Sequence, residues 1–172
     1  VFAREDAIAH DVLESIARIG SVSGANLVSI IDHGLVSLPN DTRLLPFLAL
    51  EFCEGRALAR DPLARVNWSE VSPEDAGSLC ADALEVIQHA FAGLQQLHQA
   101  KYQHLDIKPS NILVLRNSER RVTGAKLVDA GLGSIARDGE HTAVLYQSPE
   151  QLSGAQTSAA SDVFALGVVA YE

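Results

Sequence analysis

The sequence predicts a mixed α+β fold, and three observations carry this prediction. Apolar runs at 27–31 and 44–52 have the length and residue types of buried strands. Apolar residues at helical spacing fill residues 73–99. Two further apolar runs follow this helix, at 112–115 and 125–128. A chain of 172 residues that holds both kinds of element is long enough for about one domain.

Composition narrows the range of functions. Hydrophobic residues make up 47% of the chain and charged residues 20%, which is ordinary for a globular protein. The net charge of −9 and the isoelectric point near 5.0 disfavour a general binder of nucleic acid or of anionic membranes. No apolar run approaches the ~18 residues of a membrane span. We therefore expect no nucleic-acid partner and no membrane segment in this stretch.

The cysteines and the two ends of the chain give further expectations. Cys53 and Cys80 have neither zinc-ligand nor disulfide-framework spacing, which indicates a reducing compartment and a cytoplasmic location. The chain has no Met, opens on polar residues without a signal peptide, and closes within an apolar helix at 162–172. We expect it to be an internal fragment of a longer protein.

The elements before the long helix are a helix and two strands. Apolar side chains recur at helical spacing over residues 4–19, and glycines within 20–24 end this helix. The two strands that follow are joined by a turn that contains Pro39, Asn40 and Asp41.

The long helix has a strong start signal. Ser72 can cap it, Pro73 can occupy its first position, and acidic residues follow at the positive end of the helix dipole. We interpret Cys80 as a small core residue, and His89 and His98 as polar-face or boundary residues without a chemical role. The predicted apolar stripe consists of Ala76, Leu79, Cys80, Ala83, Leu84, Ile87, Phe91, Leu94 and Leu97.

The residues with the most chemical content lie at 104–112 and read H-L-D-I-K-P-S-N-I. Asp106 can accept or orient a hydroxyl proton, Lys108 can neutralise a phosphate oxygen, and the carboxamide oxygen of Asn111 can ligate Mg²⁺. The alternative is a simple surface turn, in which Pro109 fixes the backbone and Asp106 bonds local amides.

This stretch resembles the catalytic loop H-R-D-x-K-P-x-N of the eukaryotic-type Ser/Thr protein kinases, the Hanks family. A hinge-like E-F-C-E-G at 51–55 precedes it. D-A-G at 129–131 resembles the family's D-F-G, S-P-E at 148–150 resembles A-P-E, and S-D-V at 161–163 resembles the start of helix F. The resemblance runs from the family's helix C, at 4–19, to its helix F.

The resemblance implies a partial kinase-like fold of two lobes. Residues 1–53 would form the remainder of the N-lobe and the hinge, and residues 54–172 a mainly helical C-lobe truncated in helix F. The family's Gly-rich loop and strand lysine would lie before residue 1. We therefore expect this fragment alone to be inactive.

The resemblance also implies ATP and Mg²⁺ as cofactors and assigns residues to them. Asp106 would be the catalytic base or would orient the substrate hydroxyl, Lys108 would contact the γ-phosphate, and Asn111 and Asp129 would hold the metal. The cofactor-binding residues would be Leu50 as gatekeeper, Glu51 and Cys53 in the hinge, Leu113 beneath adenine, Val128, and Glu14 as partner of the strand lysine. In the role of partner to the strand lysine, Asp11 or Glu5 could replace Glu14.

Two further residues receive roles from the resemblance, and a third does not. Asp162 would anchor the catalytic-loop backbone, or would simply place a favourable charge in the first turn of a helix. Glu150 would pair with an arginine later in the C-lobe. Thr142 lies one residue away from a threonine that the family bonds to its catalytic Asp and Lys, and we give it no role.

Two positions depart from the family pattern. Leu105 stands where an arginine usually pairs with an activation-loop phosphate, which predicts a non-RD kinase with little or no dependence on that phosphorylation. Ala130 replaces the Phe of D-F-G. The predicted function is ATP-dependent phosphoryl transfer to Ser/Thr hydroxyls of protein substrates of unknown identity. The alternative is a pseudokinase that binds nucleotide, or acts as a scaffold, without turnover.

Overall fold

The computed structural model describes residues 13–14, 16–17, 19–37, 44–67, 69–130 and 144–172. The strands are β1 (Ile30–Ser37), β2 (Leu44–Leu50), β3 (Gly55–Ala57), β4 (Ile112–Arg116) and β5 (Val122–Leu127). The helices are α2 (Pro73–Gln99), α3 (Pro149–Leu152) and α4 (Ala159–Tyr171), with 3-10 turns η1 (Leu58–Arg60), η2 (Pro62–Arg65), η3 (Pro109–Asn111) and η5 (Val144–Tyr146). The predicted mixture of helices and strands is confirmed.

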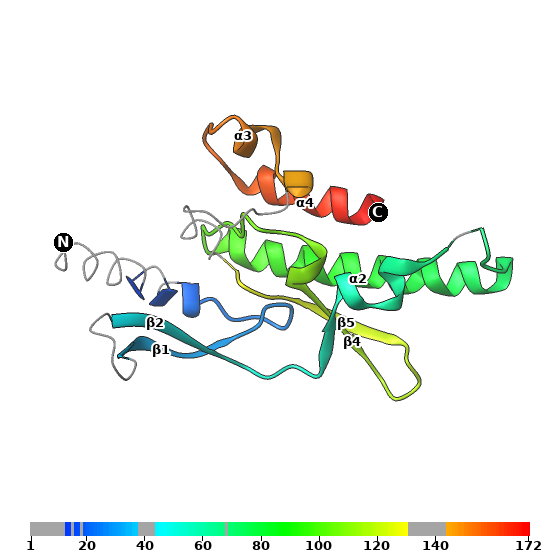
Figure 1. Ribbon diagram of the computed structural model, residues 1–172, viewed down its shortest axis with the longest axis horizontal. Coiled ribbons are helices and arrows are strands. Elements are labelled where there is room, and N and C mark those ends of the chain that lie inside the picture. The colour runs from blue at the N-terminus through cyan, green and yellow to red at the C-terminus, as the bar shows by residue number, and fades with distance from the viewer. Residues whose placement is uncertain (1–12, 15, 18, 38–43, 68, 131–143) are drawn as a thin grey trace.

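The long helix α2 lies at the centre of the molecule. Figure 1 shows it running between α4 on one side and the strands β4 and β5 on the other, with β1 and β2 as a separate ribbon. Leu94 and Leu97 of α2 are buried in one core with Ile112 and Leu127 of the sheet and Leu166 of α4. Both sides of this helix therefore contribute to the core.

The strands form two antiparallel sheets, one of β1 and β2 and one in the order β3–β4–β5. The segment before β1 joins the second sheet: Leu27 forms a parallel bridge with Leu127, and Val28 N donates to Leu127 O at 2.9 Å. The first strand accordingly begins at Ile30, three residues later than predicted, because Leu27 is already engaged with β5.

The start of α2 agrees with the prediction. Ser72 Oγ accepts a hydrogen bond from Asp75 N at 3.1 Å, and Pro73 occupies the first helical position. Glu74 and Asp75 lie in the first turn, where negative charge is favoured by the helix dipole.

The buried face of α2 differs from the predicted stripe. Leu84, Phe91 and Cys80 are exposed, so the interpretation of Cys80 as a core residue is wrong. Successive residues turn by about 100° around a helix, which places Leu84 and Phe91 far from the line through Val86 and Ala90. Apolar residues occur on several faces of this helix, so periodicity could not select the correct one. The buried residues are Val86, Ala90, Gly93, Leu94 and Leu97.

Gly93 marks a close approach of α2 to the strands. A Cβ at this position would lie 2.7 Å from Asn26 O and 3.1 Å from Leu127 Cδ1. Gly77, near the start of the same helix, has nothing within 4 Å of the place where a Cβ would lie. Packing therefore requires the first glycine and not the second.

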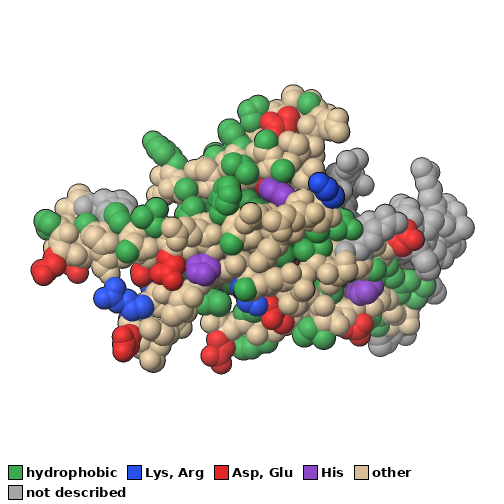
Figure 2. All heavy atoms as spheres, turned by 180° about the vertical axis from the view of Figure 1, so that it is seen from behind, with side chains coloured by type: hydrophobic (Ala, Val, Ile, Leu, Met, Phe, Trp, Pro, Cys, Tyr) green, Lys and Arg blue, Asp and Glu red, His purple; other side chains and the backbone are tan. Residues whose placement is uncertain are grey.

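Helix α4 begins at Ala159 rather than at Ser161, where the sequence predicts its start. A capping box explains the difference: Ser158 Oγ accepts from Ala160 N, and Ser161 Oγ accepts from Ser158 N, both at 3.2 Å. Phe164 and Tyr171 of α4 remain exposed, and Figure 2 shows hydrophobic side chains gathered over the upper part of the face where α4 lies. Within the described ranges, no helix has both the length and the apolar character that a membrane crossing requires.

Several predictions fall partly or wholly outside the described residues. Of the helix predicted at 4–19, residues 13–14, 16–17 and 19 are described, and all are helical. The turn at Pro39, Asn40 and Asp41 lies outside the described residues, as do Asp11, Glu5 and Thr142. The boundary between two lobes after residue 53 stays a prediction.

Candidate active site

Asp106, Lys108 and Asn111 form one hydrogen-bonded cluster. Lys108 Nζ lies 2.8 Å from Asp106 Oδ2. Asn111 Nδ2 donates to Asp106 Oδ2 and to the Asp106 carbonyl oxygen, both at 2.9 Å. Asp106 Oδ1 is buried and accepts no hydrogen bond from the described residues. The cluster thus leaves one carboxylate oxygen able to accept a proton donor, and burial of Asn111 disfavours the alternative of a simple surface turn.

Asp162 of α4 holds the backbone that precedes Asp106. Its Oδ2 accepts from His104 N at 2.8 Å, and its Oδ1 accepts from Leu105 N at 2.7 Å. His98 Nε2 of α2 lies 2.8 Å from the same Oδ2. Asp162 is only 1% exposed, so these donors replace the water that its carboxylate has lost. The predicted anchoring role is confirmed, as is the position in the first turn of α4.

Leu105 has a left-handed backbone, with φ of 62°. This conformation costs a residue other than glycine about 1–2 kcal/mol, which other contacts must offset. Leu105 N donates to Asp162, and Leu105 O accepts from Gln151 Nε2 at 3.1 Å. Both of these hydrogen bonds are made by the backbone of Leu105, so they do not depend on the side chain at position 105.

His104 ties the loop to the strand end that carries Asp129. His104 Nε2 donates to Val128 O at 3.0 Å, since a carbonyl oxygen can only accept. Val128 N donates in turn to Asn111 O at 3.0 Å. The imidazole is 0% exposed, and burial lowers its pKa despite the nearby Asp162 carboxylate. We interpret the neutral ring as a structural link.

Asp129 follows β5 with φ of 59° and an exposed side chain. It lines a small cavity of about 20 Å³ together with Leu50 and Ala130. Ala130, at the position of the family's Phe, packs against the core. The predicted gatekeeper and the predicted metal aspartate therefore border the same space.

The side chain of Glu51 is used inside the protein. Its Oε1 pairs with Lys126 Nζ of β5 and accepts from Ser29 N at 3.1 Å. The hydrogen bond from Lys126 lowers the pKa of Glu51. Leu113 lies opposite Lys126 in the sheet, so Lys126 links the predicted hinge to the predicted floor beneath adenine.

The two other predicted cofactor residues are Cys53, near Glu51, and Glu14. Cys53 is half-buried, and burial, followed by the charge of Glu51, raises the pKa of its thiol. Its carbonyl oxygen accepts from Gly55 N at 2.8 Å within a turn. Glu14 lies in the described part of the first helix with an exposed side chain.

Sequence reasoning missed three supporting residues, His98, Lys126 and Gln151. Their partners lie 64, 75 and 46 positions away along the chain. No local spacing marks such pairs, and only the neighbouring motif residues could have drawn attention to them.

The side-chain oxygen atoms of Asn111 and Asp129, near the end of β5, are of the type that binds a hard cation. Asn111 Nδ2 faces Asp106, which turns Asn111 Oδ1 away from that carboxylate, and Asp129 has no ion pair among the described residues. Mg²⁺ typically keeps waters and binds one or two protein side chains together with phosphate oxygens. The described residues hold no group of three or more His, Cys, Asp or Glu side chains that could bind a metal. Asn111 and Asp129 therefore offer oxygen ligands of the kind that Mg²⁺ prefers.

Comparison with known proteins identifies the family. The model of the protein kinase domain matches residues 5–172. The chain therefore belongs to the protein kinase domain family, and the described structure is consistent with part of that fold.

The relatives named as kinases come from plants and bacteria. The chain is 38% identical over 129 residues to a calcium and calcium/calmodulin-dependent serine/threonine-protein kinase of Lilium longiflorum, covering 72% of this chain and 22% of that protein. It is 37% identical over 128 residues to serine/threonine-protein kinase PknA of Corynebacterium glutamicum, covering 73% and 25%. It is 30% identical over 162 residues to the probable serine/threonine-protein kinase PknB of the same organism, covering 89% and 22%. The chain thus spans at most about a quarter of the length of these curated relatives.

Proposed function

We propose that the whole protein transfers the γ-phosphoryl group of ATP, with Mg²⁺, to Ser or Thr hydroxyls of protein substrates. The observation that carries this proposal is the cluster of Asp106, Lys108 and Asn111, with Asp106 Oδ1 buried and unpartnered among the described residues. A buried acceptor costs free energy unless a donor reaches it, and a substrate hydroxyl is such a donor. Membership of the protein kinase domain family supports the same reaction.

Each residue has a distinct part in the proposed reaction. Asp106 orients the substrate hydroxyl and accepts its proton as the new bond forms. Lys108 holds Asp106 in position and supplies positive charge for the transferred phosphoryl group. Asn111 and Asp129 would hold Mg²⁺, which neutralises the charge of the phosphates when bound.

The test is phosphoryl transfer from radiolabelled ATP by the whole protein and by an Asp106→Asn variant. We expect the variant to lose about 10²- to 10⁴-fold in kcat, the range for a general acid or base, with an unchanged unfolding midpoint. Retention of full transfer by Asp106→Asn would contradict the proposed role.

The alternative of a pseudokinase is favoured by Ala130. The family's Phe is absent at this position, so the ring packing that sets the active and inactive states in the family has no counterpart here. Nucleotide binding without transfer by the wild-type protein would support this alternative. Loss of Mg²⁺-dependent ATP binding in Asp129→Asn, together with measurable transfer in the wild type, would support the active enzyme.

We further propose that activity depends little on phosphorylation of the activation loop. The side chain of Leu105 cannot form charge-assisted hydrogen bonds with a phosphate. The backbone of Leu105 is bonded to Asp162 and Gln151, and these contacts hold the catalytic loop without the help of the Leu105 side chain. Phosphatase treatment should leave the phosphoryl-transfer rate of the wild type unchanged. It should also leave the rate of a Leu105→Arg variant unchanged. A large drop in either would contradict the proposal.

We also propose a cytoplasmic location, supported by Cys53 and Cys80, which are both free thiols. A fluorescent fusion found outside the cytoplasm would contradict this.

A further inference from the structure

A large cavity opens on the side of the molecule away from the catalytic loop. It has a volume of about 670 Å³ and lies between β3, η2, the first half of α2 and the turn from β4 to β5. Strand β4 separates it from the site described above, since Asn111 precedes this strand and Arg116 ends it. At about 3.3 Å per residue, Arg116 lies roughly 16 Å along the strand from the catalytic loop.

The centre of this cavity is a fixed network of one arginine and two aspartates. Arg116 Nε and Nη2 donate to the two carboxylate oxygens of Asp61, at 3.0 and 2.8 Å, and Nη1 donates to Asp82 Oδ2 at 3.0 Å. Asp61 is 1% exposed. The charge of Arg116 is thus satisfied within the protein, and the three residues form one wall of the cavity.

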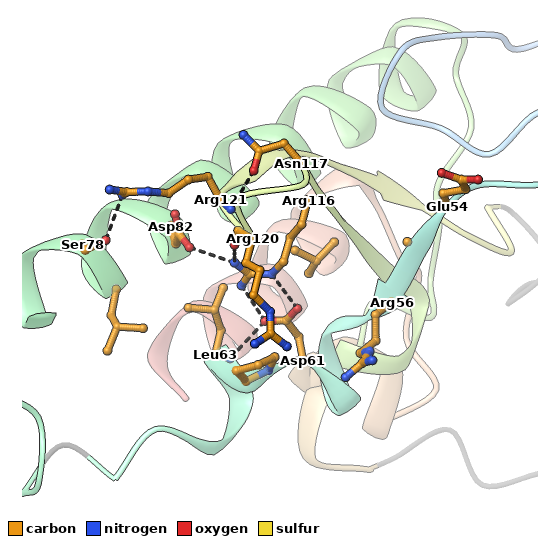
Figure 3. A pocket seen from close by; sticks show the side chains of 14 residues that line it. Glu54, Arg56, Asp61, Leu63, Ser78, Asp82, Arg116, Asn117, Arg120 and Arg121 are labelled. Carbon is orange, nitrogen blue, oxygen red and sulfur yellow. Dashed lines mark hydrogen bonds and ion pairs between the residues drawn. The ribbon is translucent and has the colours of Figure 1, made fainter.

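Three further arginines border the cavity and are exposed. Figure 3 shows Arg121 reaching Ser78 on one side of the Asp61–Arg116 pair and Arg56 on the other side, with Arg120 between them. Arg121 Nη1 donates to Ser78 Oγ at 3.0 Å. Among the described residues, none of the three forms an ion pair with a carboxylate at hydrogen-bonding distance. All three side chains are exposed, and the charge of Arg56 also contributes to lowering the pKa of the nearby Asp61.

This group of arginines lies in a chain that is acidic as a whole. An adjoining hollow of about 590 Å³ shares Gly55 and Arg56 with the cavity and adds Arg60 and Arg65. Besides the paired Arg116, residues 56–65 and 116–121 therefore hold five of the 13 lysines and arginines, together with Asp61 and Glu119, in a chain whose net charge is −9. The cavity also has apolar walls, from Leu63, Leu79 and Val114.

We propose that this cavity is a docking site for an acidic peptide segment of a partner protein, in which Asp or Glu side chains alternate with an apolar side chain. Carboxylates would bind Arg56, Arg120 and Arg121, and the apolar side chain would pack against Leu63 and Leu79. Guanidinium groups form strong hydrogen bonds with carboxylates.

The arrangement favours this occupant over other anions. The three exposed arginines surround the cavity instead of converging on one point, so they match several separated charges better than one phosphate group. Glu54 at the rim and the net charge of −9 oppose a long polyanion such as nucleic acid. The cavity shares no lining residue with the catalytic loop, so docking and phosphoryl transfer can be tested separately.

The test is fluorescence anisotropy of the whole protein with a labelled peptide of sequence Glu-Asp-Leu-Glu-Glu-Leu. The control peptides carry Gln and Asn in place of the acidic residues, Ser in place of Leu, or a single phosphoserine as the only charge. We expect the acidic peptide to bind with a Kd that rises with salt. Each of the three control peptides should bind more weakly.

The variant that tests the site is Arg120→Glu/Arg121→Glu, and Lys101→Glu is its control at the other end of α2. We expect the double variant to raise Kd about tenfold, equivalent to about 1.4 kcal/mol, and the control to leave it unchanged. If thermal unfolding shows that the double variant is not folded, Arg56→Glu is tested instead, with the same expected rise in Kd.

Three results would overturn the proposal. Equal binding by wild type and the arginine variants would place the peptide elsewhere. Equal weakening by Lys101→Glu would indicate diffuse charge attraction. Tighter binding of the phosphoserine peptide than of the acidic one would indicate a phosphate site. None of these readouts requires phosphoryl transfer, so an inactive protein would leave the docking proposal standing.

Discussion

Two buried aspartates, Asp162 in α4 and Asp61 at the start of η2, have different partners. Asp162 accepts hydrogen bonds from the backbone of His104 and Leu105, while Asp61 accepts them from the side chain of Arg116 and from Leu63 N. Each aspartate is 1% exposed. Burial alone would raise the pKa of Asp61, but the hydrogen bonds from Arg116 and Leu63 N bring it below its usual value.

The difference concerns what each carboxylate fixes. Asp162 fixes the path of the main chain at Leu105, the position of the arginine in the family's catalytic-loop motif. Asp61 fixes a side chain, so its contribution to stability depends on the presence of Arg116. A substitution can remove the Arg116 side chain, but it cannot remove the backbone N–H groups that Asp162 binds. The following predictions rest on this difference.

The largest effect is expected for Asp162→Ala. This change leaves two backbone N–H groups, of His104 and Leu105, without their acceptor, at about 1–3 kcal/mol each. Urea denaturation should show a loss of about 3 kcal/mol in the free energy of unfolding. A loss below about 0.5 kcal/mol, the level of an ordinary surface substitution, would show that the anchor is dispensable.

Asp61→Ala should destabilise the protein by a similar or slightly smaller amount, about 3 kcal/mol, because it leaves Arg116 in a partly buried site with Asp82 alone. The double variant Asp61→Ala/Arg116→Met should recover part of this loss, since apolar replacement of a buried pair is often nearly neutral. No second change can rescue Asp162→Ala in this way. Absence of any recovery would contradict the view that Asp61 acts through Arg116.

The two glycines of α2 provide a smaller, paired test. Gly93→Ala should destabilise the protein by about 1–3 kcal/mol, since the added Cβ would meet Asn26 O at 2.7 Å. Gly77→Ala has open space and should stabilise it by up to about 1 kcal/mol. The measurement is the shift in Tm of each variant, and shifts of the same sign would contradict the packing argument.

The smallest effect at neutral pH concerns His104, whose pKa burial lowers below the ordinary 6.5. The unfolded chain binds a proton near pH 6.5 and the folded chain does so only at lower pH, so stability falls as pH drops from about 6.5 toward the folded pKa. In His104→Gln this part of the pH dependence should vanish. The measurement is the slope of the unfolding free energy against pH between pH 7 and pH 5, in matched buffers. The same slope in wild type and in His104→Gln would contradict this role of His104.

Local signals in the sequence correctly predicted much of the fold. The cap at Ser72 and the whole span of α2 follow from residues next to one another in the chain. The relation between Asp162 and the catalytic loop followed from a family motif. In contrast, the Asp61–Arg116 pair joins residues 55 positions apart, outside any motif.

The errors have the same origin. Leu84 and Phe91 have the spacing of core residues, but the tertiary packing of α2 against β5 and α4 selects another face. The start of the first strand moved to Ile30 because Leu27 pairs with Leu127, one hundred positions later. Which face is buried and where a strand begins depend on partners that are distant in sequence.

The most direct test is the rate of phosphoryl transfer by the whole protein in Asp162→Asn and Asp61→Asn, measured at a temperature where both are folded. We expect Asp162→Asn to lose about 10²-fold in kcat, because a small displacement of Asp106 misaligns the reacting groups. Asp61→Asn should keep the wild-type rate. Equal losses in the two variants, or full activity in Asp162→Asn, would contradict the assignment of Asp162 to the catalytic loop and Asp61 to the arginine-lined cavity.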